Sequence, residues 1–273
     1  MAMVTPMMPI KKRLLLTGKT LNRFWRMLAT GFCFVLFGVG AFLLSLMWFR
    51  LLFLLVRNPI ERQNKARSNI SSCFRFFLET ARIIGALDYE VKGAEKLQKD
   101  KGCLILANHP TLIDYVLITS LLPKADCIVK AGLQNNFFLS GAVKAAGYLI
   151  NSEGEALINA CSKRLEAGGV IVIFPEGTRT TPNKGPKLQR GAANIAVRVP
   201  CDMRLVHVSC TETLLSKESK WYNIPKNKPV FKVDVLDKIS PTPFLEQAKG
   251  IPSLAARKLT VSLTHSLTLK KYL

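Results

Sequence analysis

The sequence is poor in acidic residues and lacks the motifs of nucleic-acid-binding proteins. Among its 273 residues, Asp and Glu number 18 whereas Lys and Arg number 39, which gives a formal net charge of +21. Such an excess favours a polyanionic partner, either nucleic acid or an anionic membrane surface. The chain shows neither zinc-finger spacing nor an aromatic-studded basic motif, so we expect no nucleic-acid partner.

The cysteines lack the arrangement of a disulfide framework or of a metal-binding motif. There are seven, an odd number, and no two of them form a Cys-x-x-Cys pair. This usage predicts buried, reduced thiols in a cytosolic redox environment.

Charge is absent from one long stretch near the N-terminus. Residues 28–49 read LATGFCFVLFGVGAFLLSLMWF, which is 22 positions without a charged side chain and long enough to cross a hydrocarbon core as a helix. The run is too long for a cleaved signal peptide and has no small-x-small cleavage site before a polar mature start. The sequence therefore predicts a basic segment and a membrane-embedded helix or hairpin within residues 1–60.

Basic residues flank this run on both sides, so the positive-inside rule gives no clear orientation. Six precede it and five follow it: Lys11, Lys12, Arg13, Lys19, Arg23 and Arg26, then Arg50, Arg57, Arg62, Lys65 and Arg67. Equal flanks are typical of a re-entrant hairpin with both ends at the cytoplasmic face, in which Gly38 and Gly40 would provide the bend. Hydropathy alone gives one ordinary transmembrane helix equal weight.

Residues 61–86 have the spacing of an amphipathic helix. Apolar residues from Ile70 to Ile84 recur at helical intervals among arginines and lysines. We expect the apolar stripe to pack on the protein core and the basic face to meet the lipid interface.

From residue 88 onward, short apolar runs alternate with helical patterns. The predicted strands are 102–107, 127–130, 170–174, 205–208 and 230–235, and the predicted helices lie near 111–121, 137–146, 154–166 and 188–197. This alternation predicts an α/β fold with a mixed, mostly parallel sheet flanked by helices. Ligand sites in such folds lie at the carboxyl ends of the strands.

A histidine and an aspartate follow the first of these strands, in the segment ANHPTLID at residues 107–114. We expect Pro110 at the first position of a helix, where its missing N–H costs nothing. His109 would then stand just outside the helix and Asp114 little more than one turn inside it. A carboxylate on one imidazole nitrogen lets the other accept a proton from an attacking hydroxyl. The strand-end position favours this general base over a structural histidine.

The second loop, FPEGTRT at residues 174–180, also ends a predicted strand. Gly177 permits close approach of a ligand to the backbone. Thr178 offers a hydroxyl, and Arg179 offers a fork that matches phosphate. Glu176 is a candidate partner for Arg179 or for a substrate hydroxyl. A structural turn held by a salt bridge is the alternative.

Together the two loops resemble those of the glycerophospholipid acyltransferase family, of the 1-acylglycerol-3-phosphate acyltransferase type. The family's block Asn-His-x4-Asp is matched by Asn108, His109 and Asp114, and its block Phe-Pro-Glu-Gly-Thr-Arg by residues 174–179. A weaker block with Lys, Gly and Ala is echoed by residues 187–192. The order and a separation near 65 residues make the pair of main blocks specific.

The resemblance covers roughly residues 88–236. It implies an acyltransferase domain over residues 61–273, with the amphipathic helix at 61–86 and the catalytic core at 88–236. The membrane-embedded element ahead of this domain is also typical of the family in kind.

The resemblance also implies roles for the site residues. His109 would be the general base on the acceptor hydroxyl, and Asp114 would orient it. The acceptor would be bound by Glu176, Gly177 and Arg179, and Asn108 and Thr178 of the same blocks are further candidates for this contact. Independently of the resemblance, Lys184, Lys187 and Arg190 add positive charge near the second loop and are candidates for phosphate or donor contacts, with a solvated basic loop as the alternative. The hydroxyl would attack the thioester of acyl-CoA or acyl-carrier protein directly, so we expect no metal and no cofactor beyond this co-substrate.

The expected partners are the lipid bilayer, a lysophospholipid acceptor and the thioester donor. We expect a location at the cytoplasmic or inner membrane, with the active site facing the cytosol.

The family's second block departs from its usual form in this sequence. It often reads Gly-x-Ile-x-Ile-Asp-Arg, whereas residues 147–152 read GYLINS and the usual arginine is missing. Because that block helps to hold the acceptor, a lyso-aminolipid, a glycolipid or a polyene lipid stays open beside 1-acylglycerol-3-phosphate. A thioesterase and a non-catalytic protein that binds anionic lipid are further alternatives; the intact His109 and Asp114 argue against the second of these.

Overall fold

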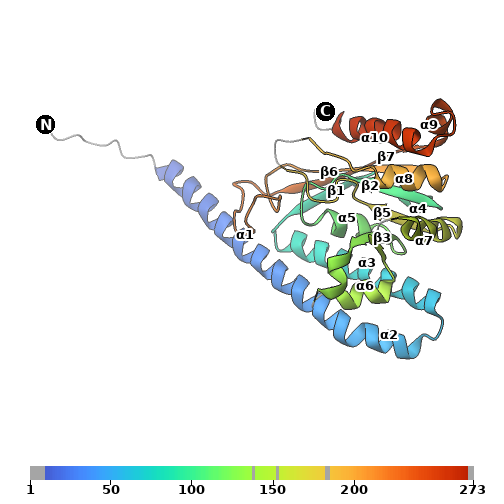
Figure 1. Ribbon diagram of the computed structural model, residues 1–273. Helices are drawn as coiled ribbons and strands as arrows, with labels where there is room; N and C mark the ends of the chain where they lie inside the picture. The colour runs from blue at the N-terminus through green and yellow to red at the C-terminus, as the bar shows by residue number, and fades with distance from the viewer. Residues whose placement is uncertain (1–9, 137–138, 152–153, 182–184, 270–273) are drawn as a thin grey trace.

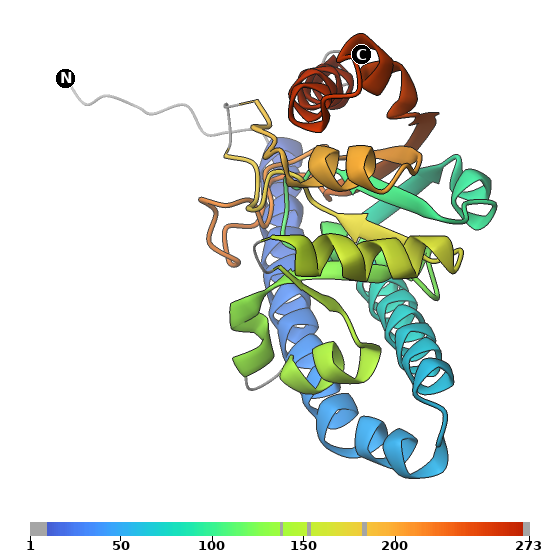
Figure 2. The same cartoon turned by 45° about the vertical axis from the view of Figure 1, so that its right-hand side comes forward.

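The computed structural model describes residues 10–136, 139–151, 154–181 and 185–269 (Figure 1). A long N-terminal helical rod lies along a domain built on one sheet. Figure 2 shows that the rod and the start of the next helix extend beyond the sheet at one end.

The rod consists of helix α1 (Ile10–Leu43), a π-helical turn (Leu44–Trp48) and helix α2 (Phe49–Leu55). The chain then reverses and continues as helix α3 (Pro59–Ile83). Asn58 caps α3, because its side-chain oxygen accepts the backbone N–H groups of Ile60 and Glu61, two donors that a helix start leaves unpaired. The predicted amphipathic helix is thus present, slightly displaced.

Gly38 and Gly40 do not provide a bend, so that expectation is wrong. Helix α1 runs through both positions. The reversal falls at residues 56–58, where Val56 is extended and Pro59 fixes the first position of α3.

A narrow stripe of the rod packs against the domain. Its buried side chains include Arg26, Ala29, Thr30 and Cys33, and later Phe49 and Leu52, at the helical spacing of one face. Most of the remaining apolar side chains are exposed. Within the described residues, Gly18–Leu55 is the one helix long and apolar enough to cross a membrane, by length and composition.

The seven-stranded sheet has the order β1-β7-β6-β2-β5-β3-β4, in which only the β6–β7 pair is antiparallel. The prediction of a mixed, mostly parallel sheet flanked by helices is confirmed. The strands are β1 (Asp88–Lys92), β2 (Cys103–Ala107), β3 (Asp126–Lys130), β4 (Leu149–Asn151), β5 (Val170–Ile173), β6 (Met203–Cys210) and β7 (Val230–Ile239).

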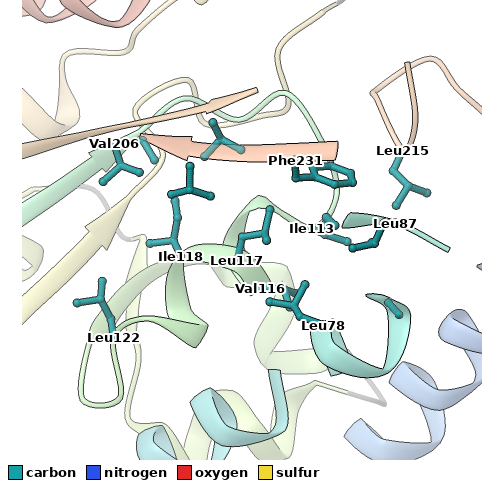
Figure 3. Packing of buried hydrophobic residues seen from close by; sticks show 14 of the residues in the cluster. Leu78, Leu87, Ile113, Val116, Leu117, Ile118, Leu122, Val206, Leu215 and Phe231 are labelled. Carbon is teal, nitrogen blue, oxygen red and sulfur yellow. The ribbon is translucent and has the colours of Figure 1, made fainter. Parts of the chain in front are cut away.

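The helices of the domain cover both faces of this sheet. They are α4 (Ala94–Gln98), α5 (Asp114–Ser120), α6 (Ser140–Ala146), α7 (Glu155–Glu166), α8 (Gly191–Arg198), α9 (Thr242–Gln247) and α10 (Pro252–Leu269), with a 3-10 helix at Ala131–Asn135. On the central strand β2, Ile105 belongs to the core beneath α3 and α5, whereas Leu104 and Leu106 belong to the core beneath α7, α8 and α10. Figure 3 shows the first of these cores, in which Leu78 and Leu117 face Phe231.

A buried ion cluster joins α3 to the sheet edge. Arg67 Nη2 lies 2.7 Å from Asp126 Oδ2, and Arg164 Nε lies 3.2 Å from the same oxygen. Arg67 Nε also donates to the carbonyl of Ala146, at 2.8 Å. The Asp126 carboxylate therefore holds together α3, β3 and α7.

Replacing Asp126 by Ala should lower the free energy of unfolding by about 3–5 kcal/mol, because it leaves Arg67 buried without its carboxylate. The measurement is urea unfolding in mild detergent followed by circular dichroism. The matched control is Glu61→Ala, which removes the exposed Lys65–Glu61 pair from α3, the helix that carries Arg67. This change should cost about 0–1 kcal/mol. Equal losses in the two variants would contradict a structural role for the cluster.

Candidate active site

Two loops meet at the carboxyl ends of the neighbouring parallel strands β2 and β5. The backbone N–H of His109 donates to Glu176 Oε1 at 2.9 Å, and the N–H of Thr180 donates to the carbonyl of His109 at 2.7 Å. The Thr180 hydroxyl also donates to Glu176 Oε1, at 2.8 Å. The backbone of His109 is therefore fixed on both sides by the second loop.

The Asp114 carboxylate is the centre of the first loop. It is fully buried, and its Oδ2 lies 2.9 Å from His109 Nδ1 and accepts the N–H of Thr111 at 2.7 Å. The Thr111 hydroxyl donates to Oδ1. Burial raises the pKa of Asp114, and the hydrogen bonds from His109 and Thr111 oppose this rise.

The helix that follows begins later than the sequence predicts. Pro110 does not start it; α5 begins at Asp114, so this aspartate is not one turn inside a helix. The reason is the carboxylate itself, because its bonds to Thr111 fold the intervening residues into a turn. The expected pairing of His109 with Asp114 is present all the same.

This pairing sets the chemistry that the histidine can perform. With Nδ1 donating to the carboxylate, Nε2 is left as a proton acceptor. The His109 ring is partly exposed in the wall of a cavity and lies 4.5 Å from the Phe174 ring between centroids. An acid–base group thus faces a space in which a substrate can lie.

The second loop contributes backbone shape and one anchored cation. Gly177 has a φ of +67°, a left-handed conformation that favours glycine. Arg179 Nη1 donates to the carbonyls of Leu215 and Ser216, at 3.1 and 3.0 Å. Among the described residues Arg179 makes no ion pair with Glu176, so the alternative of a turn held by their salt bridge is wrong.

Glu176 is a buried scaffold residue whose carboxylate supports His109. Burial raises its pKa, while the bonds from the His109 N–H and the Thr180 hydroxyl act in the opposite direction. Asn108 is also used internally: its side-chain amide donates to the carbonyl of Val208 and accepts the Val208 N–H, at 2.8 and 2.7 Å. Both residues position the site loops from behind.

The cavity measures about 880 Å³ and its wall is mostly apolar. Aromatic and apolar side chains from the helices line it, among them Phe37, Ile70, Phe74, Tyr115 and Tyr148. Polar and basic groups from the ends of β3 and β4, from the second loop and from α8 also line it, among them Lys130, Asn151, Thr178, Arg179 and Arg198. His109 lines the same cavity.

Not every basic residue expected at the site lines this cavity. In the described part of the chain, Lys187 and Arg190 are exposed and the wall beside them comes from Gln189 and Gly191. Lys184 lies outside the described residues. Sequence reasoning missed Lys130 and Arg198; their positions at the end of a strand and on the helix behind the second loop were the available signal.

Residues 88–211 match the family model described as Acyltransferase. Over these residues the chain is similar to that family. Two relatives are named 1-acyl-sn-glycerol-3-phosphate acyltransferase: one from Helicobacter pylori is 32% identical over 44% of this chain, and one from Pseudomonas aeruginosa is 26% identical over 45%. The matches span 49% and 50% of those two proteins, so the chain spans about half the length of these relatives.

A solved structure shares the fold of this chain. The crystal structure of the 1-acyl-sn-glycerophosphate acyltransferase PlsC from Thermotoga maritima is 18% identical, with a TM-score of 0.60. The superposition covers 90% of this chain and 97% of the other.

The raised pKa of Glu176 gives a pH-dependent signature. The stability that Glu176 contributes through this shift is fully present below the pKa that its carboxyl has in the unfolded chain. It is lost as the pH rises through the higher pKa that the carboxyl has in the folded protein. Relative to Glu176→Gln, the wild type should therefore lose stability over a pH range that begins at the unfolded pKa of glutamate, about 4.3, and extends upward. Thermal unfolding across that range measures the difference, with the exposed Glu246→Gln as the control. Parallel curves for wild type and Glu176→Gln would contradict the assignment.

Proposed function

We propose that this protein is a membrane-bound O-acyltransferase of phospholipid biosynthesis. It transfers a fatty acyl group from acyl-CoA or acyl-carrier protein to the hydroxyl of a lysophospholipid, with 1-acylglycerol-3-phosphate as the first candidate. The observation that carries the proposal is the His109–Asp114 pair on the wall of a cavity whose lining is mostly apolar and includes the cations Lys130, Arg179 and Arg198.

The site residues divide the reaction between them. His109 Nε2 takes the proton of the acceptor hydroxyl as its oxygen attacks the thioester carbonyl. The carbon–sulfur bond then breaks, and the imidazolium returns the proton to the leaving thiolate. Asp114 stabilises the imidazolium between these steps and holds the ring in orientation. The balanced reaction needs no metal and no further cofactor.

The cations in the cavity wall suit an anionic headgroup. Arg179 is held by two carbonyls, which pre-orders its guanidinium in the wall. Lys130 pairs with Asn151 in the β3–β4 register and lines the same cavity. Arg198 adds another charge to the same wall. These three cations support a phosphorylated acceptor despite the altered block.

The packing of the rod supports attachment to one face of the membrane. Both ends of its apolar segment contact the same domain: Ala29 and Cys33 pack in the core under α3, and Phe49 and Leu52 pack in a second cluster with α6. A helix that crossed the bilayer would separate these ends by about 30 Å of hydrocarbon. The contacts therefore favour a continuous rod that lies on one side of the bilayer, with its exposed apolar face in the cytosolic leaflet, over a spanning helix.

His109→Ala should lower the rate of acyl transfer by at least about 10²–10⁴-fold, because the proton acceptor is lost. The assay follows release of the thiol from acyl-CoA, or from acyl-carrier protein, with 1-acylglycerol-3-phosphate in detergent. The matched control is His265→Ala, an exposed histidine on α10, which should keep the wild-type rate. Full activity in His109→Ala would refute the general-base role of His109, whereas absence of acyl transfer by the wild type would favour the non-catalytic alternative.

Arg179→Ala should mainly raise the apparent KM for a phosphorylated acceptor, by about tenfold or more, since a charge-assisted hydrogen bond is removed. The comparison is 1-acylglycerol-3-phosphate against monoacylglycerol, which lacks the phosphate. An unchanged KM for every phosphorylated acceptor would favour the lyso-aminolipid, glycolipid or polyene alternative. Lipids that accumulate in cells lacking the protein would then identify the acceptor.

A further inference from the structure

The segment between β6 and β7, residues 211–229, is a loop with two attachments. Figures 1 and 2 both show it beside the N-terminal half of α1. Arg23 Nε donates to the carbonyl of Ile224 at 2.8 Å, and Arg26 Nη2 donates to the carbonyls of Pro225 and Lys226 at 3.0 and 2.7 Å. The loop is thus bound to the rod through its backbone carbonyls, and these hydrogen bonds do not use the side chains of the loop.

The tip of this loop presents aromatic and basic side chains to the solvent. Trp221 and Tyr222 are 46% and 45% exposed although they are large and amphipathic. Lys217 and Lys220 are exposed beside them, and Lys220 Nζ lies 5.6 Å from the centre of the Tyr222 ring. A fully solvated loop gains nothing from two such rings, whereas Trp, Tyr and Lys together are the side chains that favour a lipid headgroup layer.

The tip is continuous with the exposed apolar face of the rod. The Phe34 and Trp221 rings lie 5.9 Å apart between centroids, and the Trp221 and Tyr222 rings 5.7 Å apart. Trp221 also packs over Gly31, where an added Cβ would lie 3.5 Å from its ring. A bilayer that covers Phe34, itself 39% exposed, would therefore meet the tip as well.

The other attachment of the loop is to the active site. Leu215 is left-handed, with a φ of +54°, which is uncommon for a leucine and is retained only where the surroundings impose it. Its carbonyl accepts both the N–H of Leu112, at 3.0 Å, and Arg179 Nη1. Its side chain is buried near Ile113 and Leu87 (Figure 3). Along the chain, Lys217 follows Leu215 by two positions and Trp221 follows it by six, so the clamp on both site loops is directly connected to the exposed tip.

We propose that the tip formed by Lys217, Lys220, Trp221 and Tyr222 is a second lipid contact that inserts into an anionic headgroup layer beside α1. Through Leu215 and Ser216, this contact holds Arg179 in position over the membrane surface from which the acceptor arrives. The positioning part rests on the proposed function; the lipid contact does not.

The lipid contact is tested by fluorescence of the full chain. The protein has three tryptophans, so Trp25→Phe with Trp48→Phe leaves Trp221 as the sole emitter. With vesicles of phosphatidylcholine and phosphatidylglycerol, its emission should shift to shorter wavelength, and lipids brominated near the headgroup should quench it at least about twofold. The matched variant, Trp48→Phe with Trp221→Phe, reports the rod through Trp25. Quenching of Trp25 with no change in Trp221, as expected if the tip binds a protein instead, would overturn the proposal.

The charge of the tip is tested on the same sole-tryptophan background. Lys217→Glu with Lys220→Glu should abolish the preference of Trp221 quenching for phosphatidylglycerol over pure phosphatidylcholine. The control, Lys99→Glu with Lys101→Glu, makes the same charge change at two exposed positions. These positions precede β2, whereas the active-site loop follows the carboxyl end of this strand, so the control should leave the preference intact. A preference that survives in the tip variant would show that these lysines contact no anionic headgroup.

The positioning part is tested by separating two presentations of the acceptor. Trp221→Ser should raise the KM for acceptor held in vesicles at least about fivefold while leaving the KM for a dispersed short-chain acceptor unchanged, and Trp221→Phe should restore most of the loss. An equal loss with both presentations would show a merely structural role and overturn this part. If the wild type transfers no acyl group to any acceptor, the proposed function fails, yet the fluorescence result still decides the lipid contact.

Discussion

The Asp114 carboxylate is the group on which the arrangement of the site depends. It is withdrawn from solvent and satisfied by three donors, two from Thr111 and one from the His109 ring. A buried carboxylate is costly unless such donors are present, so the turn between β2 and α5 has little freedom to relax. The orientation of His109 is therefore a consequence of how one buried charge is accommodated at the start of a helix.

Sheet topology brings the remaining groups to this point. Strands β2, β5 and β6 are parallel neighbours, so residues that follow them meet at one edge even though they lie far apart in sequence. Glu176 then fixes the backbone of His109, and Asn108 ties the first loop to β6 through Val208. A cavity lies beside these loops, and residues of α3, α6 and α8 line it as well.

Much of this arrangement could be predicted from local sequence. The continuous apolar strands from Cys103 to Phe174 and their strand-end motifs identify the sheet, its edge and the His109–Asp114 pair. Two strands escape such reasoning: β1 is polar and half-exposed at the sheet edge, and β4 has only three residues. The late start of α5 was missed because a side-chain carboxylate, and not Pro110, defines the first turn.

Other features depend on contacts between distant segments, which no local pattern encodes. The Asn108 side chain bonds to Val208, and Arg179 is anchored by the carbonyls of Leu215 and Ser216. Predicting these bonds would require knowing where β6 and the loop after it lie. The reversal at residues 56–58, in place of Gly38 and Gly40, follows from packing of α2 and α3 against α6. The division into residues 1–60 and 61–273 stays a prediction, since the rod and the domain share one core.

Cys127 gives the cavity a property that bears on the order of events in catalysis. Its thiol lies in the apolar part of the wall, and burial together with the nearby Asp126 raises its pKa far above the ordinary range. The group therefore remains a thiol and is a poor nucleophile towards a thioester. For the proposed transfer, this cysteine therefore offers no covalent resting place for the acyl chain, which agrees with direct attack of the acceptor hydroxyl on the thioester.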